Sequence, residues 1–99
     1  MEITTAKNDT ALNVGIIGRL DTTTAPQLER ELNDKLEDIT ELVLDCSELE
    51  YISSAGLRVF LGLHKLMMEK GSLLVLHPND TVMEIFQVTG FDGILNIEK

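Results

Sequence analysis

The chain has 99 residues, of which 43% are hydrophobic and only 4% aromatic, so we expect one domain with an aliphatic core. Eight basic and seventeen acidic residues give a formal net charge of −9. This charge argues against direct binding to nucleic acid or to anionic lipid headgroups. The sequence shows neither a signal-peptide pattern nor an apolar run that could span a bilayer, so we expect a soluble cytoplasmic protein.

The N-terminal part of the chain is expected to form a β-hairpin. Apolar residues at 12, 14 and 16 alternate with other residues, which predicts a strand over about residues 11 to 18. This strand pairs with residues 2 to 6 through a turn at Asn8 and Asp9.

A first helix is expected after Asp21. Thr24 and Gln27 fit a capping box, and Pro26 is tolerated in a first helical turn. Apolar residues then recur on one helical face. They are Ala25, Leu28, Leu32, Leu36 and Ile39.

The short apolar runs Leu42–Leu44 and Leu73–Leu76 are typical of central strands, with a second helix between them. Pro78 to Asp80 begin a third helix that ends at Gly90, and residues 94 to 97 add a last strand. The predicted order is ββαβαβαβ, an α/β architecture in which the strand that ends at Leu44 to Ser47 is followed by a short polar loop that leads to two serines.

Two adjacent serines open the second helix, where backbone N–H groups and the helix dipole favour an anion. A serine in this position is also an ordinary N-cap. At about 100° per residue, Ser54 shares a narrow polar stripe with Arg58, whereas Ser53 points elsewhere and suits the cap. The remaining stripe residues are Gly62, Lys65 and Glu69, and wide apolar flanks surround them.

Catalytic and metal sites are not indicated. The single cysteine, Cys46, has no companions at zinc spacing and is interpreted as a buried hydrophobe. His64 and His77 have no evident nucleophile or orienting acid, and no phosphate-binding glycine loop is present. We therefore expect no cofactor, no metal and no enzymatic activity.

The whole pattern resembles the STAS domain of free-standing anti-sigma factor antagonists. The motifs that carry the resemblance are Gly18-Arg19-Leu20-Asp21, Leu44-Asp45-Cys46-Ser47, Tyr51-Ile52-Ser53-Ser54-Ala55-Gly56-Leu57 and Val88-Thr89-Gly90-Phe91. The resemblance implies a single STAS domain over residues 1–99, with a mixed β-sheet and helices packed mainly on one face.

The resemblance also implies a switch. In this family the serine two residues before the motif glycine, here Ser54, is phosphorylated by an anti-sigma factor that is a serine kinase, and a PP2C-type phosphatase reverses the modification. The unphosphorylated form binds the kinase and releases a sigma factor. Many members have Asp before the phosphoserine, where this chain has Ser53, so Ser53 is the second choice of acceptor.

The expected partner-binding residues surround this serine: Asp21, Ser53, Ser54, Ala55, Gly56 and Arg58. Asp21 matches a family aspartate that contacts the kinase, although the residue also suits a turn or a helix start. The alternative function is a constitutive STAS scaffold, for example a regulatory subunit of a transporter or signalling complex, without phosphorylation.

Overall fold

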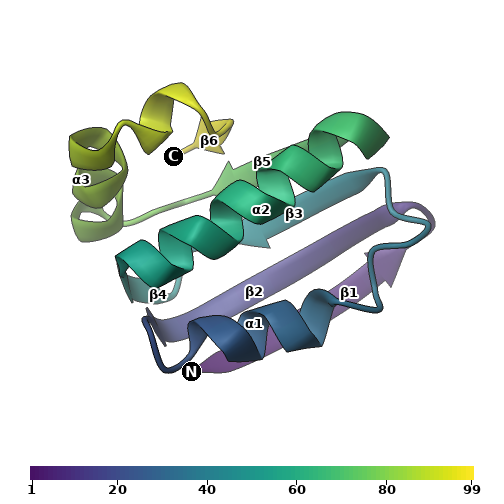
Figure 1. Ribbon diagram of the computed structural model, residues 1–99, viewed down its shortest axis with the longest axis horizontal. Coiled ribbons are helices and arrows are strands. Elements are labelled where there is room, and N and C mark those ends of the chain that lie inside the picture. Colours follow the sequence, from purple (N-terminus) through teal and green to yellow (C-terminus); the bar gives the residue numbers. More distant parts are fainter.

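The computed structural model describes all 99 residues as a layer of helices against one sheet (Figure 1). The strands are β1 (Glu2–Asn8), β2 (Ala11–Leu20), β3 (Glu41–Asp45), β4 (Leu49–Ile52), β5 (Ser72–Leu76) and β6 (Ile97–Glu98). The helices are α1 (Ala25–Leu32), α2 (Ser54–Lys70) and α3 (Asp80–Thr89), with a short 3₁₀ turn, η1 (Phe91–Gly93).

The sheet is mixed, as predicted. Its order is β1-β2-β3-β5-β6, with β1 antiparallel to β2 and the remaining neighbours parallel. The hairpin prediction is confirmed, but its turn lies one residue later than predicted, because Asn8 pairs with Ala11. Asp9 takes the left-handed conformation that such a tight turn requires, at φ 58°.

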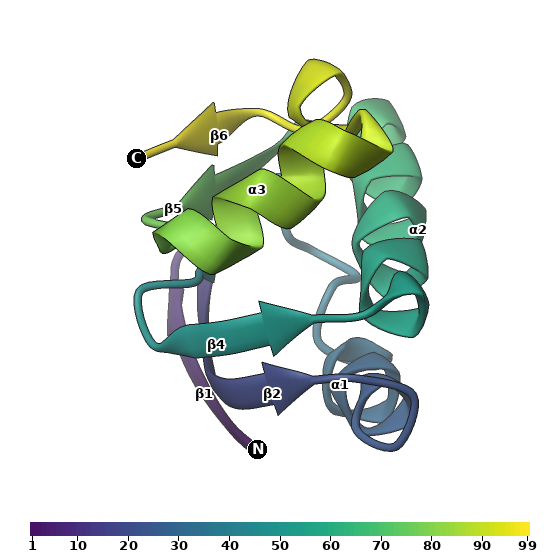
Figure 2. The ribbon, with the colours of Figure 1, turned by 90° about the vertical axis from the view of Figure 1, so that its left-hand side faces the viewer.

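The helices α1 and α2 lie on the same side of the sheet, and α3 packs at one end of it, beside β4 (Figure 2). The alternate residues of β2 that face them, Leu12, Val14 and Ile16, are fully buried. These side chains belong to a mainly aliphatic core of 23 buried residues. Phe60 of α2 meets Phe86 of α3 with ring centroids 6.3 Å apart, so α2 and α3 share this core.

The predicted boundaries of α3 are confirmed by its caps. The Asn79 side chain accepts a hydrogen bond from the Val82 N–H at 2.8 Å and so caps the N-terminus. Gly90 ends the helix in the left-handed conformation, at φ 80°. The last strand is shorter than predicted, because Ile94 and Leu95 follow η1 and only Ile97–Glu98 pairs with β5.

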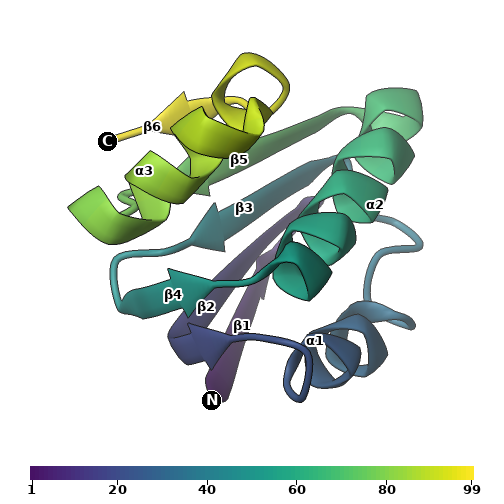
Figure 3. The ribbon, with the colours of Figure 1, turned by 60° about the vertical axis from the view of Figure 1, so that its left-hand side comes forward.

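The predicted element order lacks one strand, since residues 49 to 52 were expected to be loop. They form β4, which pairs in parallel with the end of β2 and has a register irregularity between Gly18 and Arg19. A four-residue strand is too short to show a clear alternation: Leu49 and Ile52 are buried, with Glu50 exposed and Tyr51 half-buried between them. Figure 3 shows β4 leading directly into α2.

Two predictions for the first helix are wrong. The helix ends at Leu32, so Leu36 and Ile39 are buried from the following loop rather than from a helical face. The predicted capping box is also absent, because the Thr24 side chain makes no cap hydrogen bond. Its hydroxyl instead accepts from the Asp21 N–H at 2.8 Å and donates to the Arg19 carbonyl at 2.9 Å, which closes the loop before α1.

Candidate phosphorylation and partner-binding site

The candidate site lies where β2 and β4 end side by side. Leu20 and Ile52, the last residues of these strands, are register partners. The Ser53 N–H then donates a hydrogen bond to the Leu20 carbonyl at 2.8 Å. Asp21 and Ser53 therefore leave the same edge of the sheet from neighbouring strands, although they are 32 positions apart in the sequence.

The two serines occupy different positions at the start of α2. Ser53 is the N-cap: its backbone is extended, and its Oγ accepts a hydrogen bond from the Gly56 N–H at 3.4 Å. Ser54 is the first helical residue; its side chain is exposed, and its hydroxyl has no hydrogen-bond partner within the chain. The predicted assignment of the cap to Ser53 is confirmed.

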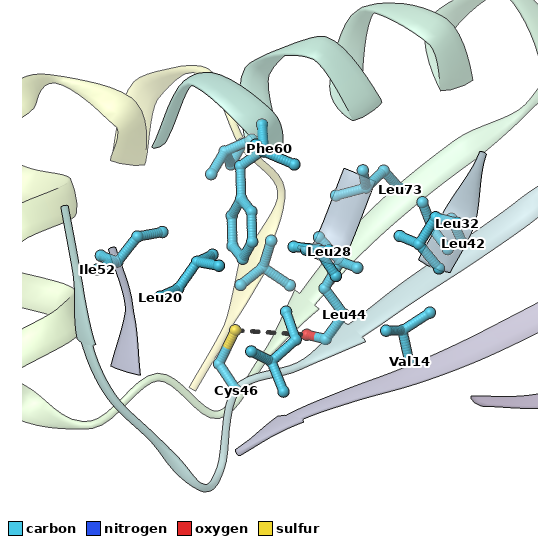
Figure 4. Packing of buried hydrophobic residues seen from close by; sticks show 14 of the residues in the cluster. Val14, Leu20, Leu28, Leu32, Leu42, Leu44, Cys46, Ile52, Phe60 and Leu73 are labelled. Atoms are coloured by element: carbon cyan, nitrogen blue, oxygen red, sulfur yellow. Dashed lines mark hydrogen bonds between the residues drawn. The ribbon is translucent and has the colours of Figure 1, made fainter. Parts of the chain in front are cut away.

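Gly56 brings the start of α2 close to the strand ends. A Cβ at this residue would lie 2.8 Å from Ile52 Cγ1 and 2.9 Å from Leu20 Cγ, well inside ordinary contact. Figure 4 shows the Leu20 and Ile52 side chains near Phe60 in the core below α2. Gly56 is itself buried, so it positions the serines rather than presenting a surface of its own.

Asp21 organises the loop before α1. Its Oδ1 accepts hydrogen bonds from the N–H groups of Thr23 at 3.0 Å and Thr24 at 3.2 Å. The bond from the Thr24 N–H is the main reason that the pKa of the Asp21 carboxyl is lowered. Since Oδ2 has no partner within the chain, the charged carboxylate keeps one oxygen for an external donor.

The exposed stripe of α2 matches the predicted one. Ser54, Arg58, Gly62, Lys65 and Glu69 are all exposed. The Arg58 guanidinium forms no ion pair within the chain, because the two salt bridges present join other residues.

A groove between α1 and α2 starts near the serines. The part of the groove nearest the serines is lined by Thr22, Ala25, Pro26, Glu29, Ala55, Arg58 and Val59. Its continuation is lined by apolar side chains of both helices, including Leu32, Leu63 and Leu66. Leu66 is 39% exposed there, whereas Leu57 on the core side of α2 is buried. The wide apolar flank of α2 is thus covered only in part by the domain itself.

Sequence reasoning assigned no role to Arg19 and Tyr51, which are adjacent in space. The Arg19 Cζ lies 4.5 Å from the centroid of the Tyr51 ring, a cation–π contact between β2 and β4. Both residues belong to motifs that carry the STAS resemblance. Their pairing depends on β4, which was not predicted from the sequence.

The remaining chemistry of the chain is limited. The Cys46 thiol lies in the core, close to the Leu44 carbonyl (Figure 4), and burial raises its pKa to about 12. No group of three or more His, Cys, Asp and Glu side chains lies close enough to hold a metal ion. No helix is long and apolar enough to cross a membrane.

The sequence profile of the STAS domain matches residues 2–99, and the chain belongs to the STAS domain family. Members of this family that resemble it are regulatory binding proteins rather than enzymes. The anti-sigma-B factor antagonist of Bacillus subtilis (strain 168) is 29% identical over 92 residues, which cover 92% of this chain and 84% of that protein. The anti-sigma-B factor antagonist of Listeria monocytogenes (EGD-e) is 30% identical over 90 residues, which cover 89% of this chain and 79% of that protein.

Solved structures confirm the fold. The unphosphorylated form of the anti-sigma factor antagonist SpoIIAA matches with a TM-score of 0.84 at 18% identity, over 99% of this chain and 89% of that one. The phosphorylated form of SpoIIAA from Bacillus matches with a TM-score of 0.76 at 17% identity, over 99% of this chain and 92% of that one. The predicted α/β class with a mixed sheet is therefore correct.

Proposed function

We propose that this chain is an anti-sigma factor antagonist that is switched by phosphorylation of Ser54. In the unphosphorylated form it binds an anti-sigma factor with serine kinase activity in the cytoplasm and so frees a sigma factor. A PP2C-type phosphatase restores the phosphorylated protein to the binding form. The names of the similar proteins support the antagonist function. The observation that carries the switch is the exposed, unbonded Ser54 hydroxyl beside a neighbour that already serves as the cap.

The electrostatics of α2 favour an effect on the partner rather than on the fold. A phosphate carries about −1.5 to −2 charges, whereas an anion at an exposed helix N-terminus gains only about 0.3 to 1 kcal/mol. Arg58, one turn after Ser54, is free to neutralise part of that charge. The free domain therefore accommodates the phosphate without refolding.

The same phosphate is costly inside an interface. Leaving a buried charge without its partner costs about 3 to 5 kcal/mol, and each 1.4 kcal/mol changes affinity about tenfold. We therefore expect phosphorylation to weaken binding to the anti-sigma factor by at least about 100-fold.

The contact surface in this proposal comprises the groups around Ser54: the half-buried Asp21, Ser53 and Ala55, and the exposed Arg58. The unpaired Oδ2 of Asp21 suits a lysine or arginine of the kinase, because the other oxygen is already held by the loop. Gly56 contributes indirectly, by holding the start of α2 against Leu20 and Ile52.

Phosphorylation mapping tests the proposal. The wild-type protein, Ser54→Ala and Ser53→Ala are incubated with the cognate anti-sigma kinase and ATP, and the modified residue is located by mass spectrometry. We expect phosphate on Ser54 in the wild type and in Ser53→Ala, and none in Ser54→Ala. Treatment with the PP2C-type phosphatase removes it.

Phosphate on Ser53 in the wild type, or on neither serine, contradicts the assignment. Binding of Ser54→Ala to the kinase, measured by calorimetry, is expected to equal that of the unphosphorylated wild type. This second measurement separates loss of the acceptor from loss of the binding surface.

A further inference from the structure

The excess of negative over positive charge in the chain comes from two segments. Residues 36–57 contain six acidic residues, residues 71–98 contain four, and neither segment contains a lysine or arginine. The rest of the chain carries seven acidic and eight basic residues, so it is close to neutral. The net charge of −9 therefore comes from these two segments alone.

The fold brings four of these ten acidic residues to one end of the molecule. Asn79, the cap of α3, also donates through its Nδ2 to the Leu49 carbonyl at 3.1 Å, which ties the β3–β4 segment to the start of α3. The exposed carboxylates of Glu48 and Glu50 thus lie on a segment adjoining the helix that carries Asp80 and Glu84. None of these four forms an ion pair within the chain.

An exposed apolar hollow lies at the same end. We call it the α3–β4 surface; it is lined by Tyr51, Thr81, Glu84, Ile85, Val88 and Thr89. Val88 is 80% exposed, the highest value among the large exposed hydrophobic side chains of the chain. Tyr51, one of the lining side chains, also contacts the Arg19 guanidinium through its ring. Figure 2 shows α3 and β4 side by side at this end.

The negative charge around the α3–β4 surface indicates what kind of partner it binds. Nucleic acid, anionic lipid and a second copy of this chain are all negative and are repelled by unpaired carboxylates. A lysine- or arginine-rich protein surface is attracted, and a large apolar side chain at its centre would cover Tyr51, Ile85 and Val88.

We propose that the α3–β4 surface is a second docking site for the anti-sigma factor, which contacts it with a basic surface around one large apolar side chain. This inference rests on the proposed function for the identity of the partner. The surface does not include Ser54, so it contributes to binding in both phosphorylation states. Long-range attraction by the carboxylates accelerates encounter, and burial of Val88 slows dissociation.

Two variants separate these contributions. Glu84→Lys reverses one charge of the surface, and Asp34→Lys is its control, because Asp34 is exposed in the neutral part of the chain. Val88→Ala removes the apolar contact, and Met68→Ala is its control on α2, where Met68 is 70% exposed. Alanine is the better helix former and both side chains are exposed, so these variants remain folded.

Association and dissociation with the purified cognate anti-sigma factor are followed by stopped-flow fluorescence or surface plasmon resonance. We expect Glu84→Lys to slow association about fivefold at low salt, with the difference vanishing near 0.5 M salt, where charges are screened. We expect Val88→Ala to dissociate about tenfold faster. For both control variants, the association and dissociation rate constants are expected to stay within about twofold of the wild-type values.

The outcomes distinguish this inference from the proposed function. If the wild type binds and Ser54 phosphorylation weakens binding, but Glu84→Lys and Val88→Ala behave as their controls, the α3–β4 surface is not a docking site and the switch still stands. If the wild type does not bind the anti-sigma factor, both are overturned.

Discussion

Replacing Gly56 with alanine is expected to force the start of α2 away from the sheet. The added Cβ would lie 2.8 Å from Ile52 Cγ1, 2.9 Å from Leu20 Cγ and 3.0 Å from Leu20 Cδ2. Carbon atoms pack at about 3.5 to 4.0 Å, so contacts on two strands must open by nearly 1 Å. The two most crowded atoms, Ile52 Cγ1 and Leu20 Cγ, are bonded directly to Cβ, and both side chains are fully buried, so they have little freedom to turn away.

Two opposing effects set the magnitude. Overpacking a well-filled core costs about 1 to 3 kcal/mol, whereas replacing glycine with alanine in a helix gains up to about 1 kcal/mol. The net loss is about 1 kcal/mol in the free energy of unfolding, which corresponds to a fall of about 4 to 8 °C in Tm for a domain of this size.

Gly62 provides the matched control in the same helix. Nothing lies within 4 Å of a Cβ at Gly62, so Gly62→Ala causes no steric clash. It keeps only the stabilisation that alanine brings to a helix in place of glycine, and it is expected to raise Tm. Both variants are compared with the wild type by urea and thermal unfolding monitored by circular dichroism. If Gly56→Ala matches Gly62→Ala in stability, the steric argument for Gly56 is wrong.

Three further predictions concern single groups. Because burial raises the pKa of Cys46 from its ordinary 9.0 to about 12, the unfolded chain loses this proton first, and the free energy of unfolding falls as pH rises between these values. The native thiol is correspondingly expected to resist Ellman's reagent at pH 8 until urea unfolds the protein; rapid reaction of the native protein would contradict its burial. The lowered pKa of Asp21 stabilises the fold at pH above its ordinary 3.8, and this contribution is lost as pH falls through the lower folded value. An NMR titration of the Asp21 carboxyl should give a midpoint below 3.8, with the Thr24 amide following the same curve, and a midpoint at or above 3.8 refutes this. Ser53→Ala removes the α2 cap and is expected to cost about 0.5 to 1 kcal/mol in chemical unfolding, whereas Ser53→Asp, which retains a cap acceptor, should cost nothing.

The sequence predicted the elements whose signals are local. The hairpin follows from alternation in β2, and α3 follows from Asn79 and Gly90, because caps and periodicity act within a few residues. The separate positions of Ser53 and Ser54 were also predictable, since one residue rotates a helix by about 100°. The acceptor role of Ser54 remains a prediction.

Only the tertiary structure decided the features that depend on neighbours distant in the sequence. β4 is a strand because the end of β2 offers it backbone partners, and the loop at Asp21 closes through Thr24 and Arg19 rather than through a capping box. The stacking of Arg19 on Tyr51, the close approach at Gly56 and the gathering of unpaired carboxylates beside α3 arise in the same way. Periodicity and capping patterns specify which side of an element is buried, whereas the partner it meets is fixed by the packing of strands and helices from the whole chain.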